Sequence, residues 1–336
     1  MLGLYVHVPF CAIKCPYCDF YSTKYTKKYA LDFVESIKQE IDTYPKLEFD
    51  TLYFGGGTPS LLPIEFLNEI LLNIRKHFSL KLCESTIEIN PNTVNFDKLS
   101  ALKALGFDRL SVGVQSIHDN ELLKLGRKHT AKQALNCIEN AKKAKFENIS
   151  VDIMLGIPEQ TIESLSKTIE KLKDVQHISA YILKIEENTP FYGTVEVDDD
   201  EVANMYLFMV EKLKQFGFIQ YEISNFSKQG FESQHNLKYW RCEEYIGLGK
   251  SAHSFYNGKR YYDRNIITEE HPATYSERAM LGLRLCEGFS IKDFSKAEEY
   301  AKKYESLGLL EFKDDKIALT PKGFLVSNTI ICDLSG

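Results

Sequence analysis

Short apolar runs alternate with longer amphipathic stretches along the first half of the chain. The apolar runs are rich in β-branched residues and predict six strands, at residues 4–8, 51–54, 86–89, 109–114, 149–154 and 178–183. The stretches between them have helical periodicity and predict helices at residues 27–44, 63–78, 96–105, 131–144 and 162–172. Strands that alternate with helices form a parallel sheet with right-handed crossovers. Six strands are fewer than the eight of a closed TIM barrel, so we expect an α/β fold with an open, three-quarter (β/α)6 TIM-like barrel.

The second half of the chain has a looser pattern. It predicts a helix at residues 201–216, entered through the acidic run Asp198–Asp200 as its N-terminal cap, and a further strand of the sheet at 219–224. Residues 225–264 are aromatic and rich in turn formers. Helices at 272–285 and 297–307 and short strands at 309–313 and 316–319 then predict a small winged-helix-like α+β module. The expected domains are a partial barrel (1–225), an aromatic bridging segment (226–268) and the winged-helix-like module (269–336).

Charge and hydropathy narrow the class of protein. The 336 residues include 41 basic and 47 acidic ones, a net charge of −6, and residues 287–336 lack a cluster of arginines. A nucleic-acid-binding protein usually carries a basic stripe, so we expect no nucleic-acid partner. No apolar run reaches the roughly 18–20 residues of a membrane span, and no basic segment precedes the apolar N-terminus. We therefore expect a cytoplasmic protein, in which the eight cysteines do not form a disulfide framework.

Three of the eight cysteines, Cys11, Cys15 and Cys18, lie within eight residues. Thiolates are soft ligands that suit zinc or an iron–sulfur cluster. Zinc needs a fourth ligand, and His7 is a poor candidate because it lies in a predicted strand, where we expect it to form local hydrogen bonds. Three thiolates on a four-iron cluster leave one iron open to a small molecule. The remaining cysteines are dispersed and are expected to act as small buried hydrophobic residues: Cys83, Cys137, Cys242, Cys286 and Cys332.

Polar residues stand at the carboxyl ends of several predicted strands, where an α/β barrel carries its site. Gly55–Thr58 follow the second strand, and three glycines let the backbone approach a ligand and expose N–H donors, although a tight turn explains them almost as well. Glu88, Gln115 and Asp152 interrupt or end three other strands, and Arg127 is a candidate partner for a carboxylate. Together they predict a shared polar ligand.

The cysteine spacing C-x3-C-x2-C, with an aromatic residue before the last cysteine, resembles the radical S-adenosylmethionine (SAM) superfamily. The resemblance implies a [4Fe-4S] cluster on Cys11, Cys15 and Cys18 whose open iron binds SAM. The segments YVHVPFC, GGGTPS, IEINP, GVQSI followed by LGRKH, and DIMLGIPEQT resemble the branch that contains oxygen-independent coproporphyrinogen III oxidase. In that branch the matching positions contact SAM: Tyr5, Tyr17, Gly56, Gly57, Thr58, Glu88, Gln115, Arg127 and Asp152.

Two members of this branch must be distinguished. The oxidase, which decarboxylates propionates of coproporphyrinogen in a SAM-dependent radical reaction, carries a cysteine directly after the third ligand and an N-terminal extension. Here Asp19 follows Cys18, and ten residues precede Cys11. The HemW family of haem chaperones has C-D-F after the triplet and an H-N-x-x-Y-W motif, which resemble Cys18–Phe20 and His235–Trp240. The oxidase is the alternative, and a radical enzyme acting on another macrocycle or on RNA is a third reading that the acidic charge disfavours.

The resemblance to HemW implies that the protein binds haem and transfers it to acceptor haemoproteins, some of them at a membrane, and that it has no catalytic residues of the oxidase kind. A histidine can ligate haem iron and aromatic side chains can stack on the macrocycle, which makes His235 the candidate haem contact. His253 and Cys242 are alternatives, and a purely structural role for His235 stays open.

Overall fold

The computed structural model describes residues 1–196, 198–263, 266–270, 272–290 and 297–335. Arg264 and Gly336, which end two of the predicted segments, lie outside these ranges. The six predicted strands are confirmed as neighbouring parallel strands of one large sheet. They are β1 (Leu2–Val8), β4 (Glu48–Gly56), β5 (Ser79–Ile89), β6 (Arg109–Gln115), β7 (Asn148–Leu155) and β8 (His177–Ile182). The sheet does not close, and its edge strands in the order of pairing are β14 and β9, so the open barrel is confirmed.

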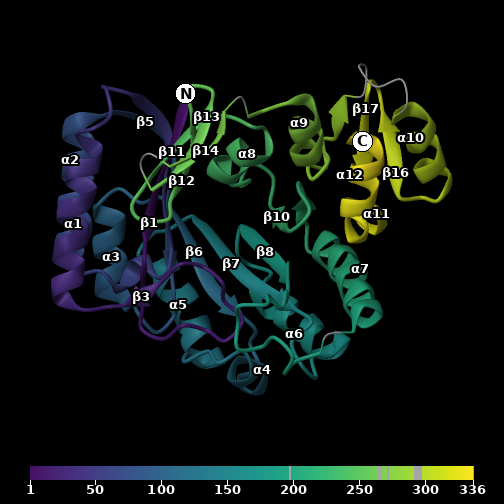
Figure 1. Cartoon of the computed structure of the whole chain (residues 1–336). Coiled ribbons are helices and arrows are strands. Elements are labelled where there is room, and N and C mark those ends of the chain that lie inside the picture. The colour runs from purple at the N-terminus through teal and green to yellow at the C-terminus, as the bar shows by residue number, and fades with distance from the viewer. Residues whose placement is uncertain (197, 264–265, 271, 291–296, 336) are drawn as a thin grey trace.

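Helices connect these strands and line the outer side of the barrel (Figure 1). They are α1 (Lys27–Ile41), α2 (Ile64–His77), α3 (Phe96–Ala104), α4 (Asp119–Lys124), α5 (Ala131–Lys143) and α6 (Ile162–Leu172), with a 3-10 turn at Pro59–Leu61. Most begin at a side-chain cap, as at Thr130 and Thr161, whose hydroxyls accept from the third amide of the helix. The long helix α7 (Asp199–Gln215) follows β8, and the predicted acidic cap is confirmed because Asp198 accepts from the Glu201 amide at 2.9 Å.

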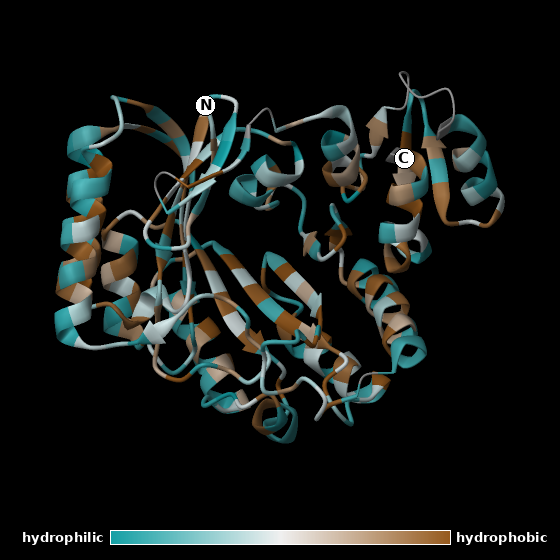
Figure 2. Cartoon of the chain, viewed as in Figure 1, coloured by the Kyte–Doolittle hydropathy of each residue, from teal (hydrophilic) through white to brown (hydrophobic). Residues whose placement is uncertain are grey.

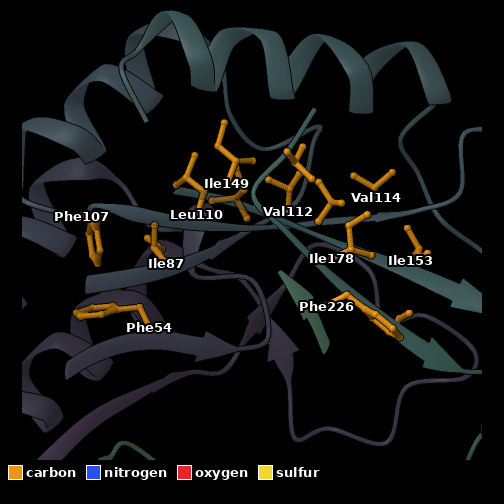
Figure 3. Close-up of a cluster of buried hydrophobic side chains, with 14 of the residues drawn as sticks. Phe54, Ile87, Phe107, Leu110, Val112, Val114, Ile149, Ile153, Ile178 and Phe226 are labelled. Carbon is orange, nitrogen blue, oxygen red and sulfur yellow. The ribbon is translucent and has the colours of Figure 1, made fainter. Parts of the chain in front are cut away.

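Hydrophobic and polar residues alternate along the central strands, so the sheet has one apolar face and one polar face. The bands of hydrophobic and less hydrophobic residues are visible along β6, β7 and β8 in Figure 2. One set of residues packs in the core between the sheet and its helices, including Phe54, Leu110, Val112, Ile149 and Ile178 (Figure 3). The alternate set, which includes Glu88, Ser111 and Asp152, faces the inside of the barrel. The sheet is therefore built to bury its outer face and to present polar groups on its inner one.

The predicted strand at 219–224 is wrong beyond its first two residues. Strand β9 covers Ile219–Gln220, and the chain then turns back into β10 (Asn225–Ser227), which pairs antiparallel with β8. The turn is fixed by Glu222, whose carboxylate accepts from the Ser224 amide at 3.2 Å, and by the Ile223 amide, which donates to the Arg284 carbonyl at 2.9 Å. These bonds draw the segment out of the sheet.

The aromatic stretch contains more regular structure than its turn residues predict. It forms α8 (Gln234–Trp240) and the strands β11 (Tyr245–Leu248), β12 (His253–Tyr256), β13 (Lys259–Tyr262) and β14 (Ile266–Glu270). Strand β11 pairs parallel with β1, so it is a seventh parallel strand beside the first. Helix α8 packs against β4 and β5.

The C-terminal module has the predicted helices and hairpin. It comprises α9 (Tyr275–Gly282), β15 (Phe289–Ser290), α10 (Ala297–Ser306), β16 (Leu310–Lys313), β17 (Lys316–Leu319), α11 (Pro321–Leu325) and α12 (Ser327–Ser335), with the three strands in the order β15-β17-β16. Helix α9 is shorter than predicted at both ends, because it begins after the Thr274 cap and ends at Gly282. The three-domain division stays a prediction. Among the described residues, no helix has both the length and the hydrophobicity to cross a bilayer.

Candidate cofactor site

A cavity of about 470 Å³ lies at the carboxyl ends of the central strands, beneath the cysteine loop. Its lining includes all three clustered cysteines and eight of the nine residues predicted to contact SAM: Tyr17, Gly56, Gly57, Thr58, Glu88, Gln115, Arg127 and Asp152. These residues come from six different parts of the chain, and parallel topology is what brings the ends of their strands together.

The cysteine loop extends from β2 (Phe10–Cys11) and is tied back to the barrel by pairing of β2 with β3 (Thr23–Lys24). All three thiols are half-buried. Cys11 Sγ lies 3.8 Å from Thr58 Oγ1, and Arg127 Nη1 lies 3.7 Å from Cys15 Sγ. Burial raises the pKa of the Cys18 thiol. The loop thus presents three soft ligands to one cavity.

This donor set fits an iron–sulfur cluster. The described part of the chain has no group of three His, Cys, Asp or Glu side chains gathered around a single metal ion. A four-iron cluster takes each thiolate on a different iron, so its ligands need to surround one volume without converging on one ion. Cys11, Cys15 and Cys18 line one cavity in this way.

The glycine loop, Gly55–Thr58, lies against the segment that joins β1 to the cysteine loop. The Gly57 and Thr58 amides donate to the carbonyls of Val8 and Phe10 at 2.8 and 2.7 Å, and a Cβ at Gly57 would come within 2.7 Å of the Phe10 carbonyl oxygen. The Gly56 amide donates to Glu88 Oε2 at 3.1 Å. The expectation of exposed N–H donors is therefore wrong for these three amides. Glycine is needed here for close backbone packing.

Two carboxylates stand on the inner wall of the cavity. Glu88 accepts from the Tyr53 hydroxyl at 2.8 Å, and Asp152 accepts from the Ser111 hydroxyl at 3.2 Å. Burial, followed by the charge of Asp152, raises the pKa of Glu88 to about 7, and burial raises that of Asp152 to about 6. The two carboxyl groups can accept hydrogen bonds from a polar ligand, and their raised pKa values lie close to neutral pH.

The raised pKa of Glu88 predicts a pH-dependent stability. A carboxyl whose pKa rises from 4.5 to about 7 on folding stabilises the protein fully below about pH 4.5 and loses that effect as the pH rises through about 7. Between pH 5 and 8, the free energy of unfolding should fall by about 2 kcal/mol more in the wild type than in Glu88→Gln. Urea denaturation across this range measures the difference. The exposed Glu139→Gln variant should follow the wild type, and parallel curves for Glu88→Gln would refute the assignment.

Gln115 and Arg127 complete the polar lining. Gln115 has φ 66°, a left-handed conformation that costs energy for a residue with a side chain, and a register shift between Gly113 and Gln115 accompanies it. Arg127 donates to Asn90 Oδ1 at 2.6 Å and to the Gly113 carbonyl at 2.8 Å. The lining residues that sequence reasoning missed include Asn90, Ser111 and Tyr181. The signal for Ser111 was present, because it is the inward-facing position two residues before Gly113.

Tyr5 is the predicted SAM contact that does not line this cavity. Its hydroxyl lies 3.1 Å from His7 Nδ1, and His7 Nε2 lies 3.1 Å from the Tyr21 carbonyl oxygen. The expectation that His7 bonds locally is therefore confirmed.

His235 lies inside the barrel and has no exposed surface. Its Nδ1 is 2.8 Å from Thr51 Oγ1 and its Nε2 is 2.8 Å from the Tyr239 hydroxyl. Burial lowers its pKa to about 3, so the ring is neutral. In this arrangement neither nitrogen is available to iron, and the haem contact at His235 stays a prediction.

The two alternatives to His235 lie in different surroundings. His253 is exposed on β12 and stacks on Tyr262 with ring centroids 5.6 Å apart. Cys242 is buried, with Arg260 Nη2 at 3.8 Å from its sulfur. Neither residue is among those that line the cavity.

Comparison with known proteins agrees with this site. Residues 5–172 match the Radical SAM superfamily, and residues 270–326 match the HemN C-terminal domain. The solved structure of coproporphyrinogen III oxidase (HemN) from Escherichia coli, a radical SAM enzyme, superimposes with a TM-score of 0.82 at 19% identity, covering 99% of this chain and 90% of that one. At this identity the likeness concerns the fold. The fold and the cysteine-lined cavity are thus those of a radical SAM protein, and the chain belongs to that superfamily.

Relatives within the superfamily specify the branch. The heme chaperone HemW of Bacillus subtilis (strain 168) is 34% identical over 98% of this chain and 98% of its own length. The HemW of Lactococcus lactis subsp. lactis (strain IL1403) is 32% identical over 97% and 95% of the two chains. The chain belongs to the HemW family.

Proposed function

We propose that the protein is a haem chaperone that binds a [4Fe-4S] cluster, SAM and haem, and that passes haem to acceptor haemoproteins. The observation that carries the proposal is the cavity, whose lining combines the three thiols with Glu88, Asp152 and Arg127. The names of the HemW relatives support the chaperone activity.

Each group in the cavity has a defined task in this proposal. Cys11, Cys15 and Cys18 would hold the cluster, which when bound supplies an open iron for the amino-acid end of SAM and a source of one electron. Arg127 places its guanidinium beside the Cys15 sulfur, at 3.7 Å. Glu88 and Asp152 would accept hydrogen bonds from SAM hydroxyls. The remaining predicted contacts, Tyr17, Gly56, Gly57, Thr58 and Gln115, shape the wall around it.

The mouth of the same cavity suits a flat apolar ligand. Its lining includes Ile13 and Phe20, whose side chains are 56% and 65% exposed, and Tyr181 and Ile182, which are 43% exposed. Exposed apolar side chains gathered at one opening are typical of a binding surface. Lys14 and Lys184 also line it and could attract carboxylates such as haem propionates. These features support haem binding at the mouth, whereas binding at His235 would require α8 to leave the sheet.

A haem titration separates the two locations. We expect Phe20→Ser to weaken haem binding about tenfold or more, because burial of a phenylalanine side chain contributes about 1.5–3 kcal/mol. His235→Ala should bind haem with an unchanged Soret maximum. The measurement is absorption spectroscopy of the purified full chain with haem.

An altered Soret band in His235→Ala, together with wild-type affinity in Phe20→Ser, would move the site to His235. Leu123→Ser is the matched control, because Leu123 is 77% exposed and is not among the residues that line the cavity. Conversion of coproporphyrinogen to protoporphyrinogen by the reconstituted protein with SAM and a reductant would replace the chaperone reading by the oxidase alternative.

A further inference from the structure

The cavity is connected to the interior of the barrel through Tyr53 on β4. The Tyr53 hydroxyl donates to Glu88 Oε1 at 2.8 Å, so one end of this side chain touches the cavity wall. Its ring stacks on the His235 imidazole, with centroids 5.2 Å apart and an interplanar angle of 29°. Glu88, Tyr53 and His235 therefore form one continuous chain of contacts from the cavity to α8, which we call the interior chain.

His235 is fixed from every side. Both ring nitrogens have hydrogen-bond partners, and its amide donates to Glu84 Oε1 at 3.1 Å. The same carboxylate accepts from the Gln234 amide at 2.9 Å, so Glu84 holds the first turn of α8 against the sheet. Gly3 on β1 makes room for the imidazole, since a Cβ there would lie 3.1 Å from His235 Cε1. The ring that supports Tyr53 therefore has one position.

The other end of α8 is bound to the C-terminal module. The Arg284 guanidinium lies over the Trp240 ring at 5.8 Å from its centroid, and Arg241 Nη2 pairs with Glu287 Oε2 at 3.2 Å. A displacement of α8 would therefore change contacts both at the cavity wall and in the C-terminal module.

We infer that Tyr53, supported by His235, is the positioning residue that holds Glu88 toward the bound ligand, and that through this chain occupancy of the cavity is coupled to the position of α8. The inference rests on the proposed binding of SAM in the cavity. Coupling between two sites is reciprocal, so a ligand that orders Glu88 also stabilises the docked α8. In this role the HNLKYW segment supports the SAM cavity without touching its ligand.

The groups around Glu88 allow the positioning role of Tyr53 to be tested through the pKa of Glu88. Asp152 on β7 and Arg109 on β6 face it, as do the phenols of Tyr5, Tyr53, Tyr181 and Tyr239 on β1, β4, β8 and α8. The Tyr53 hydrogen bond lowers the pKa of Glu88 against the effect of burial. Removal of this one hydroxyl should raise that pKa without removing a ring.

The experiment compares the cluster-reconstituted wild type with Tyr53→Phe, titrated with SAM. We expect the substitution to weaken SAM binding about tenfold and to raise the pH below which binding is lost. Trp240 is the only tryptophan of the chain, so its fluorescence reports on α8 alone. SAM should change this emission in the wild type and not in Tyr53→Phe.

Tyr44→Phe is the matched control, because it removes a phenol hydroxyl that lies 3.4 Å from Tyr261, away from the cavity. It should keep wild-type affinity, pH dependence and emission change. His235→Ala, which leaves the Tyr53 hydroxyl but removes its support, should weaken SAM binding in the same direction.

If the wild type binds SAM and Tyr53→Phe keeps the same affinity and pH dependence, the inference is overturned and the proposed function is not. Failure of the reconstituted wild type to bind SAM would overturn the proposed function together with it. If Tyr53→Phe does not fold, wild-type SAM affinity in His235→Ala would overturn the inference.

Discussion

Cys15→Ala is expected to abolish iron loading. Anaerobic reconstitution of the wild type should give about four irons per chain, as a [4Fe-4S] cluster requires, and the variant should retain well under one. Cys15 is the thiol that Arg127 contacts at 3.7 Å, so its loss removes a ligand and leaves the guanidinium without its sulfur partner. Iron and sulfide analysis with absorption near 400 nm measures the loading.

The control for this experiment is Cys332→Ser. The expectation that Cys332 is buried is wrong, because it is exposed in α12. It is not among the cavity residues, so full loading is expected. Full loading of Cys15→Ala would refute the assignment of the cluster to this triplet.

Glu84→Gln is expected to lower the free energy of unfolding by about 3–5 kcal/mol. Arg109 is 1% exposed, and Glu84, whose carboxylate lies 3.9 Å from its Nε, is the carboxylate with which it forms an ion pair. Two of the guanidinium nitrogens, Nε and Nη1, have no hydrogen-bond partner within the described part of the chain. Without the charge of Glu84, this buried cation would lose its ion-pair partner and keep only weaker interactions with groups such as Asp152. Urea denaturation followed by circular dichroism measures the loss.

We expect Arg109→Met to lower the free energy of unfolding by less than Glu84→Gln does. In Arg109→Met the carboxylate keeps its bonds to the amides of Gln234 and His235. Glu84→Gln combined with Arg109→Met should therefore recover most of the stability that Glu84→Gln loses. A loss below about 1 kcal/mol in Glu84→Gln would show that this ion pair does not stabilise the fold.

The sequence was sufficient to predict the partial barrel and most of the cavity, because both follow from local patterns. Glu88 and Asp152 interrupt apolar strands, and parallel strand ends meet at one edge. The seventh parallel strand, β11, could not be predicted in this way, since its partner β1 is far away in the chain and its residues resemble a turn-rich segment.

The surroundings of His235 could not be predicted from local sequence patterns either. The motif made His235 a candidate haem contact beside aromatic residues and left a structural role open, and the aromatic neighbours are present. The contact that buries the ring depends on Glu84, 151 residues earlier. A histidine in such a motif is equally compatible with a surface ligand and with an interior support, and the tertiary contact decides between them. The amides of the glycine loop are a similar case, because Val8 and Phe10 accept their hydrogen bonds.

The pairing of β1 with β11 has a consequence for biosynthesis. Strand β1 leaves the ribosome long before β11, so its edge on the β11 side cannot pair until Tyr245–Leu248 have been made. At about 5–20 residues per second, this edge stays open for tens of seconds. An open strand edge is a site of aggregation, so the nascent chain needs protection during this interval. Delivery of iron and sulfide to the loop before the barrel is complete would meet a strand that is still unpaired on one side.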